Sequence, residues 1–335
     1  MSEAGTARAR VLAALRGERV RPVPVGAVTQ SASVAQMEAL GTHWPDAHFD
    51  ASLMAGLAAG AHTLLGFDLV RVPFDQTIEA ELLGAQVDYG DQVSNCAVRR
   101  HPLAAADPLP LLPDLGRGRP QAVVEAIRKL RRRMAEKAAV LGGIVGPFTL
   151  VCQLLGVSTT LVDALRRPDV LRPWLHFAVK LSAEYARRQV EAGADAICVE
   201  DMSASLDLTS PAIYRDLILP AQRQLIAGIG VPVILHVCGS NTRILDLLAA
   251  SGATALSLET RTDLAQAVSC HNGGVVGGVA PVEVLLNGSV EDVRKASAAC
   301  LAAGVHLLAP GCGIAPKTPT PNLREMTRVA REWRR

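Results

Sequence analysis

The chain has 335 residues, of which 34 are basic and 32 acidic, and its formal net charge is +2 at neutral pH. This balance gives no general attraction to nucleic acid or to an anionic membrane, so neither is an expected partner. No apolar run reaches the ~18 residues that a membrane-spanning helix requires. Hydrophobic residues make up 49% of the chain but aromatic residues only 3%, which favours an aliphatic core of parallel strands covered on both faces.

Cysteine usage indicates a reducing compartment. The seven cysteines are odd in number and show no clustered spacing of the kind that marks a disulfide framework. No signal peptide is recognisable at the start of this sequence. We therefore expect the protein in the cytoplasm.

The order of the predicted elements indicates the fold class. The start, "TARARVLAALRGERV" (6–20), predicts a helix that leads into an extended segment. Short β-rich runs separated by helical stretches then follow, and there are eight of them, at 22–28, 68–75, 142–148, 195–201, 232–238, 253–259, 273–281 and 305–312. This alternation predicts an α/β protein, a single (β/α)8 TIM barrel formed by residues 1–335 as one domain.

Two intervals between the predicted strands are longer than one helix. They cover residues 76–140 and 149–194, so we expect insertions after the second and third strands. The stretch "GAQVDYGDQVSNCAVRR" (84–100) alternates enough to predict a hairpin over the exit of the second strand.

Polar residues stand at the carboxyl ends of the predicted strands, where the active sites of such barrels lie. As single residues, many of them have an ordinary alternative role as a helix cap or as a satisfied partner in the barrel mouth. The set from the fifth, sixth and eighth strands is harder to explain in that way, because those strand ends face a common mouth. The residues at strand ends are Gln30, Asp75, Glu200, Asp201, His236, Cys238, Glu259 and Cys312.

The stretch "VILHVCGSN" (233–241) suggests a metal centre. In an extended strand, residues two apart share one face, so His236 and Cys238 project to the same side. Together with Cys312 they meet the three-ligand requirement of catalytic zinc, with Glu259 placed to supply the fourth ligand. Thiolate ligands argue against magnesium and calcium. The alternative is a buried histidine beside an inert buried cysteine.

Several stretches resemble one known family over nearly the whole chain. They are "WPDAHFD" (44–50), "VRVPFDQTIEAE" (70–81), "GPFTL" (146–150), "ILHVCG" (234–239) and "LAPGCGIAPKTPTPNLREM" (308–326). On these motifs the chain resembles the uroporphyrinogen decarboxylase superfamily, and within it the methylcobamide:coenzyme M methyltransferase branch. The resemblance implies a (β/α)8 barrel with catalytic zinc on His236, Cys238 and Cys312. It also aligns Asp75 with the catalytic aspartate of the decarboxylases.

The resemblance implies transfer of a methyl group from a methylated corrinoid (methylcobamide) to a small thiol such as coenzyme M or homocysteine. We expect a separate carrier protein to deliver the corrinoid, because "DAHFDA" (46–51) lacks the final glycine of a carrier signature. Glu259, Asp75, Glu200 and Asp201 are the candidate catalytic residues, and Gln30, Arg71 and Phe148 the candidate corrinoid contacts. For Glu200 and Asp201, a structural capping role is an equal alternative. A homodimer is an open alternative for the assembly.

Two other functions stay open from the sequence. The first is metal-independent decarboxylation of a porphyrinogen or a related acid. The arginine-containing segment that grips the porphyrin in the decarboxylases is replaced here by "GAVTQSASV" (26–34), which argues against it. The second is a non-catalytic, zinc-stabilised module that only docks a corrinoid protein, and its zinc site would be closed by four protein ligands.

Overall fold

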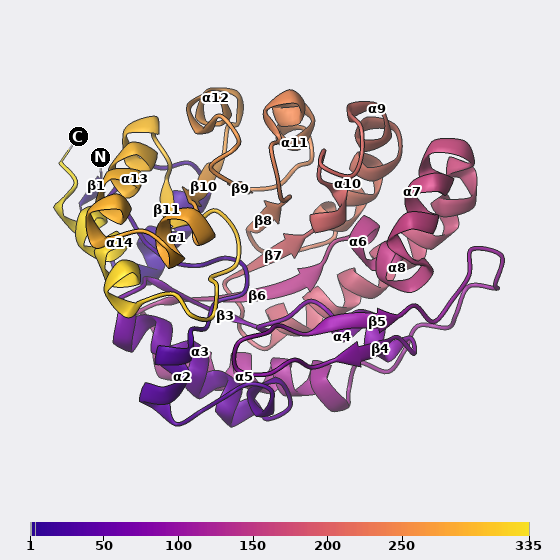
Figure 1. The fold of residues 1–335 in the computed structure, drawn as a ribbon, viewed down its shortest axis with the longest axis horizontal. Coiled ribbons are helices and arrows are strands. Elements are labelled where there is room, and N and C mark those ends of the chain that lie inside the picture. The colour runs from indigo at the N-terminus through magenta and orange to yellow at the C-terminus, as the bar shows by residue number, and fades with distance from the viewer. Residues whose placement is uncertain (1, 4, 335) are drawn as a thin grey trace.

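The computed structural model describes residues 2–3 and 5–334. Within them, one curled sheet of seven parallel strands forms the centre of the molecule, and each strand lies beside its sequence neighbour in that sheet (Figure 1). The strands are β3 (Leu69–Val72), β6 (Ala139–Val145), β7 (Ala196–Glu200), β8 (Val233–His236), β9 (Ala255–Leu258), β10 (Gly274–Val279) and β11 (Leu307–Pro310). They overlap seven of the eight predicted strand runs.

The prediction of a strand at 22–28 is wrong. Only Val25 pairs in this segment, as an isolated parallel bridge to Leu308. Pro22 and Pro24 have no N–H to donate, so a continuous ladder cannot form there. The segment still contacts both edges of the sheet: Gly26 N donates to Leu308 O at 3.1 Å, and Asp68 N donates to Val25 O at 2.7 Å.

Small aliphatic side chains fill the inner face of the curled sheet. The cluster includes Ala139, Ala196 and Ala255, each on a different strand, together with Val11 and Leu15. The last two belong to helix α1 (Ala7–Leu15), which contacts β3, β6, β10 and β11. Helix α1 therefore closes the amino end of the sheet, and this leaves the carboxyl end for a site.

Helices cover the outer face of the sheet and enclose the larger apolar cluster. Before β3 lie β1 (Ser2–Glu3), α1, β2 (Val20–Arg21), α2 (Val34–Leu40), η1 (Asp46–His48) and α3 (Ala51–Leu65). Between β3 and β6 lie α4 (Ile78–Leu82), the antiparallel hairpin β4 (Gln86–Asp88) and β5 (Ala97–Arg100), and α5 (Gly118–Met134). Between β6 and β7 lie α6 (Pro147–Leu155), α7 (Val157–Arg166) and α8 (Pro168–Glu191).

Shorter connections follow in the second half of the chain. After β7 come η2 (Met202–Ala204), α9 (Pro211–Ile213), η3 (Tyr214–Ile218) and α10 (Leu219–Ala227). After β8 and β9 come η4 (Thr242–Ile244), α11 (Leu245–Ala249) and α12 (Leu264–Cys270). The chain ends with η5 (Pro281–Leu286), α13 (Val290–Ala303) and, after β11, α14 (Thr320–Glu332).

Among the described residues, no single helix is both long and apolar enough to cross a bilayer, although the bent pair Pro147–Leu155 and Val157–Arg166 passes that test when taken together.

We expect Gly274→Ala to lower the free energy of unfolding by about 1–3 kcal/mol. The added methyl group would lie 2.5 Å from the carbonyl oxygen of Ala14 and 2.9 Å from Leu15 Cα, so helix α1 must move off the sheet. Denaturant titration of the purified variant measures the change. Gly56→Ala is the control, since no atom lies within 4 Å of its added methyl. Equal unfolding free energies for the two variants would contradict the role given to α1.

Candidate metal centre at the carboxyl ends of the strands

Parallel register brings three polar side chains into one row at the strand ends. Glu200 on β7 pairs with His236 on β8, and His236 pairs in turn with Ser257 on β9. All three side chains are fully buried. The row lies one step beyond the layer of small residues on the inner face, because alternate residues of a strand share a face.

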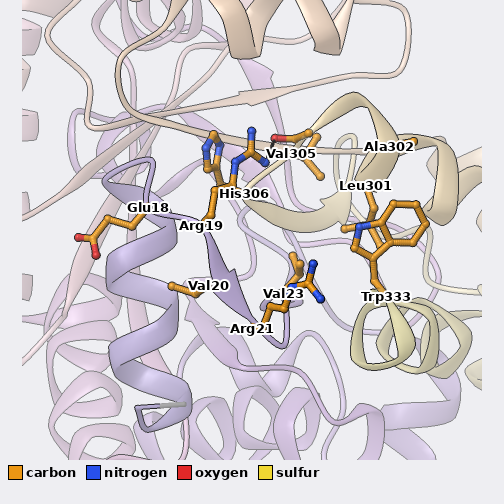
Figure 2. A pocket seen from close by; sticks show the side chains of 11 residues that line it. Glu18, Arg19, Val20, Arg21, Val23, Leu301, Ala302, Val305, His306 and Trp333 are labelled. Carbon is orange, nitrogen blue, oxygen red and sulfur yellow. Dashed lines mark hydrogen bonds between the residues drawn. The ribbon is translucent and has the colours of Figure 1, made fainter. Parts of the chain in front are cut away.

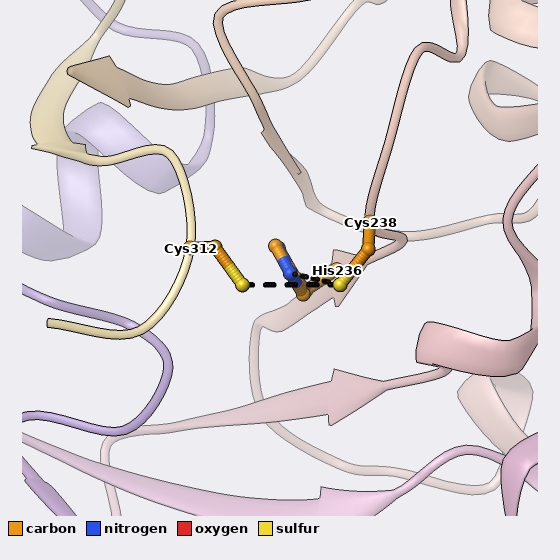
Figure 3. Close-up of side chains that lie close together, drawn as sticks. All are labelled: His236, Cys238 and Cys312. Atoms are coloured by element: carbon orange, nitrogen blue, oxygen red, sulfur yellow. Dashed lines mark hydrogen bonds between the residues drawn. The ribbon is translucent and has the colours of Figure 1, made fainter. Parts of the chain in front are cut away.

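Two cysteines complete a compact group with His236 at the end of β8 (Figure 3). Cys238 Sγ lies 3.3 Å from His236 Nε2 and 3.8 Å from Cys312 Sγ. Cys312 comes from the loop after β11, and both cysteines are half-buried. One ligand atom from each of the three residues lies within 4.8 Å of the other two. The structure thus brings together the three residues that the sequence predicts as metal ligands.

Ser257 fixes the orientation of the His236 ring. His236 Nδ1 lies 3.0 Å from Ser257 Oγ, which leaves Nε2 facing the cysteines. A hydrogen bond to the far nitrogen is the usual way in which a protein orients a ligating imidazole. Sequence reasoning missed Ser257, although it stands two residues before Glu259 and therefore on the same face of its strand.

The sulfurs of Cys238 and Cys312 are in hydrogen-bond contact, and either can be the donor. Hydrogen bonding from Cys238 lowers the pKa of Cys312, and His236 acts in the same direction, while burial opposes them. The pKa of Cys238 is raised, first by the same hydrogen bond and then by burial. A site with one ready thiolate, a second thiol and an imidazole suits a borderline-soft ion such as zinc better than magnesium or calcium. The donor set therefore fits zinc.

Glu259 lies beside this group and is held by other contacts. Its Oε1 accepts a hydrogen bond from Gly239 N at 2.7 Å, and its Oε2 lies 3.3 Å from two nitrogens of Arg261. Arg261 also pairs with Asp207 at 2.8 Å. Among the described residues, the three-donor group does not include Glu259. Its role as a fourth ligand stays a prediction.

Glu200 forms a buried ion pair behind the candidate ligands. Its two carboxylate oxygens accept hydrogen bonds from Arg71 Nη2 and Gln76 Nε2. Arg71, predicted as a corrinoid contact, is only 1% exposed and also donates to the Pro73 carbonyl at 2.7 Å. The side chains of Arg71 and Glu200 thus hold each other beneath the mouth.

Asp201 has the geometry of a helix cap. Its Oδ1 accepts hydrogen bonds from Thr149 N at 2.7 Å and Thr149 Oγ1 at 2.9 Å, at the start of α6. Gln222 donates to its Oδ2 at 2.9 Å. Phe148, next to Thr149, is fully buried. Gln30 is half-buried and its carbonyl accepts a hydrogen bond from Ile314 N at 2.9 Å, close to Cys312 in the chain.

Asp75 follows β3 but belongs to a different group of side chains. Arg119 from α5 donates to its Oδ2, and Thr77 donates to its Oδ1 from both N and Oγ1. Burial alone would raise the pKa of Asp75, but the positive charge of Arg119 and these hydrogen bonds hold it at about 2. No sequence pattern points to Arg119, which lies 44 residues further along the chain.

A pocket of about 340 Å³ lies at the other end of the strands (Figure 2). It is lined by Arg19 and Val23, which precede the Val25 bridge, by His306, which precedes β11, and by Trp333. It contains none of the predicted site residues. Since barrel active sites occupy the carboxyl end, we assign the chemistry to the group around His236 rather than to this pocket.

Comparison with known proteins identifies the family of this chain. The family description "Uroporphyrinogen decarboxylase (URO-D)" matches residues 6–333. The chain belongs to this family. It is 35% identical over 335 residues to "Methylcobamide:CoM methyltransferase MtbA" of Methanosarcina acetivorans, with 98% of each chain covered. A solved structure, "methyltransferase from Methanosarcina mazei", superposes with a TM-score of 0.94 at 34% identity and covers 98% of both chains.

Decarboxylases of the family match a smaller part of this protein. "Uroporphyrinogen decarboxylase" of Syntrophotalea carbinolica is 32% identical over 213 residues, which is 60% of this chain and 61% of that protein. The similarity to the methyltransferase therefore covers 98% of this chain, whereas the similarity to that decarboxylase covers 60%.

Glu79 of α4 carries a buried carboxyl group, and sequence reasoning did not single it out. Its Oε1 accepts a hydrogen bond from Val145 N at 2.9 Å, at the end of β6. Burial raises its pKa from 4.5 to about 7, against the effect of that hydrogen bond. The folded state therefore binds a proton at Glu79 that the unfolded state releases between these pH values.

We expect this proton to make stability depend on pH. The contribution of Glu79 is fully present below pH 4.5 and is lost as pH rises through about 7, a loss on the order of 3 kcal/mol. Denaturant titrations of the unsubstituted protein and Glu79→Gln, repeated from pH 4.5 to 8, measure it. The amide cannot ionise but can still accept from Val145 N, so the advantage of the unsubstituted protein should shrink as pH rises. A pH-independent difference would show that Glu79 is ionised in the folded protein.

Proposed function

We propose that this protein is a zinc-dependent methyltransferase that moves a methyl group from a methylated corrinoid to a small thiol, such as coenzyme M or homocysteine. The observation that carries the proposal is the group of His236, Cys238 and Cys312 at the carboxyl ends of the strands. The full-length similarity to methylcobamide:CoM methyltransferases supports it. A separate protein would deliver the corrinoid.

We assign two kinds of role to the residues of the centre: some would bind zinc, and one orients a ligand. His236 Nε2 and the sulfurs of Cys238 and Cys312 would hold the zinc ion, while Ser257 keeps the imidazole turned toward it. Zinc bound there would make the substrate thiol a thiolate at neutral pH. In the transfer, the substrate sulfur forms a bond to the methyl carbon, and the cobalt–carbon bond breaks with its electron pair remaining on cobalt.

We infer that Glu259 supplies the fourth ligand before the thiol binds. Its carboxylate stands next to the turn that follows Cys238. Oε2 accepts from two nitrogens of Arg261, whereas Oε1 accepts a single hydrogen bond, from Gly239 N. A carboxylate oxygen has a second lone pair that could face an ion. Since zinc favours thiolate over carboxylate, the substrate sulfur would displace it. The alternative is that water holds this position and Glu259 acts through its neighbours.

For the other predicted site residues we propose indirect roles. Glu200 places a negative charge behind His236, and Arg71 holds Glu200 in place. Asp201 and Phe148 support the start of α6 beside the mouth. Gln30 is the corrinoid-contact candidate that is not fully buried. Asp75 differs from these residues: we keep the proposal that it takes part in the reaction, although Arg119 and Thr77 hold its carboxylate in a group apart from His236.

We further propose that the curled sheet is a closed (β/α)8 barrel in which the Val25 segment takes the eighth place, since it bonds to both sheet edges. Residues 1–335 would then form one domain, with insertions after the second and third strands. We expect the protein to act in the cytoplasm, with the corrinoid carrier and a thiol as partners and without nucleic acid or membrane. A homodimer stays the alternative assembly.

Methylcobalamin, used as a free methyl donor with a panel of thiols, tests the proposed function. The unsubstituted protein should consume methylcobalamin with coenzyme M or homocysteine. Cys312→Ala should lose one zinc per chain, and its rate should fall at least roughly thirty-fold, because a thiol of pKa ~8.5 is only about 3% ionised at pH 7. Cys270→Ser, on an exposed cysteine of α12, is the control and should keep both zinc and rate.

The same preparations separate the alternatives. Turnover of a porphyrinogen that survives the loss of zinc in Cys312→Ala would favour the decarboxylase. Zinc that is retained without demethylation by any thiol would favour the docking module. Either result would overturn the proposed methyl transfer.

The fourth-ligand role of Glu259 has a matched test. Glu259→Gln should weaken zinc binding about tenfold or more, measured by competition with a chromophoric chelator, because an amide is a poorer ligand than a carboxylate. Asp207→Asn is the control: Asp207 pairs with the same arginine, Arg261, but is not a proposed ligand. Unchanged zinc affinity in Glu259→Gln would assign the fourth position to water.

A further inference from the structure

A second group of metal-type donors lies under the hairpin, apart from the centre at His236. His48 ends η1, Asp75 follows β3, and Cys96 immediately precedes β5. One ligand atom from each lies within 4.8 Å of the other two. We propose that His48, Asp75 and Cys96 bind a second divalent ion of zinc-like softness, which ties the hairpin to η1 and to the end of β3.

His48 is the observation that points to a ligand here. Its side chain is 1% exposed, yet neither ring nitrogen has a hydrogen-bond partner among the described residues. Nδ1 lies 3.4 Å from Asp75 Oδ2, and the ring stacks on Trp44 at 5.5 Å between centroids. A buried polar group without a partner destabilises the folded state, and a bound ion would remove that cost.

His48 and Asp75 could bind an ion without losing a proton, whereas Cys96 would have to lose one. Burial lowers the pKa of His48 to about 4, so the imidazole is neutral and has a free lone pair. Asp75 is ionised, as its pKa of about 2 requires. The Cys96 thiol, which is bonded only weakly to the Tyr89 carbonyl at 3.5 Å, has its pKa raised by burial. It would lose its proton on binding the ion, as ligating thiols do.

The charge of the surrounding network leaves room for a cation. Arg119 is paired with two carboxylates, Asp75 and Glu81, and its guanidinium carbon lies 5.6 and 5.4 Å from the ring centroids of Phe49 and Tyr89. One guanidinium against two carboxylates leaves one negative charge, and a Cys96 thiolate would make it two. A divalent ion would bring this sum to zero, so the nearby arginine does not forbid the site.

The donor types select the ion class. One sulfur, one imidazole nitrogen and one carboxylate oxygen make a mixed set that suits zinc, whereas magnesium and calcium take oxygen ligands. Three protein ligands leave one position for water. An entry path exists at the hairpin tip, since residues 91–95 are exposed and Cys96 itself is half-buried.

The test uses the full-length protein, dialysed after exposure to zinc, with metal content measured per chain. Cys96→Ser should contain one zinc fewer than the unsubstituted protein, and His48→Gln should show the same loss. Cys270→Ser, which changes the exposed cysteine at the end of α12 and belongs to neither group, should lose none. Thermal unfolding monitored by circular dichroism confirms that each variant is folded.

Cobalt(II) substitution keeps the test decisive if a variant fails to fold. Cys238→Ser/Cys312→Ser removes the sulfur ligands of the first centre, so a thiolate-to-cobalt absorption band that remains, and that is lost when Cys96→Ser is added, must come from Cys96. Persistence of that band supports the second site. Its absence, or equal zinc in Cys96→Ser and the unsubstituted protein, overturns the proposal and leaves the methyltransferase proposal untouched, because the latter depends on Cys312.

Discussion

The parallel register of β7, β8 and β9 is the constraint on which the candidate centre depends. It places Glu200, His236 and Ser257 in one row, so that the imidazole has a carboxylate on one side and a hydroxyl on the other. A slip of one residue would turn every side chain of a strand to its opposite face. His236 would then point into the helical layer and could not meet Cys312, whose loop belongs to a distant strand. The ligand geometry is therefore a property of the whole sheet.

Buried ion pairs hold the polar residues around the mouth in fixed positions. Arg71 with Glu200 and Arg119 with Asp75 each place two charges out of contact with water. Such pairs contribute little net stability, because the cost of desolvation offsets their attraction, but losing one partner costs several kcal/mol. Gly143 lacks the side chain that would meet the Arg71 guanidinium. Glycine at position 143 thus leaves space for the Arg71 guanidinium. The main effect of this charge is to fix the rotamer of Glu200.

Sequence reasoning located seven strands and three residues that lie together as candidate metal donors, for physical reasons that also explain its failures. The seven strands of the sheet were visible as short aliphatic runs, and His236 and Cys238 stood out because polar residues interrupt such a run at its end. The strand prediction at 22–28 is wrong because the valines of this segment favour a strand, whereas Pro22 and Pro24 have no N–H to donate to a neighbouring strand. Arg119 and His48 could not be found at all, since their proximity to Asp75 depends on how α5 and η1 pack against β3.

The two ends of the sheet show why stability and chemistry are separated in this fold. At the amino end, helix α1 covers the inner layer of small side chains, and the backbone of Ala14 lies so close to Gly274 that a methyl group cannot fit. This tight closure excludes water and supplies apolar burial. At the carboxyl end, the same strands carry a histidine, two thiols and several carboxylates that individually disfavour burial. The chain can hold these polar groups because helix α1, at the amino end, fixes the register of the strands. The donors at the carboxyl end therefore do not have to stabilise the sheet that positions them.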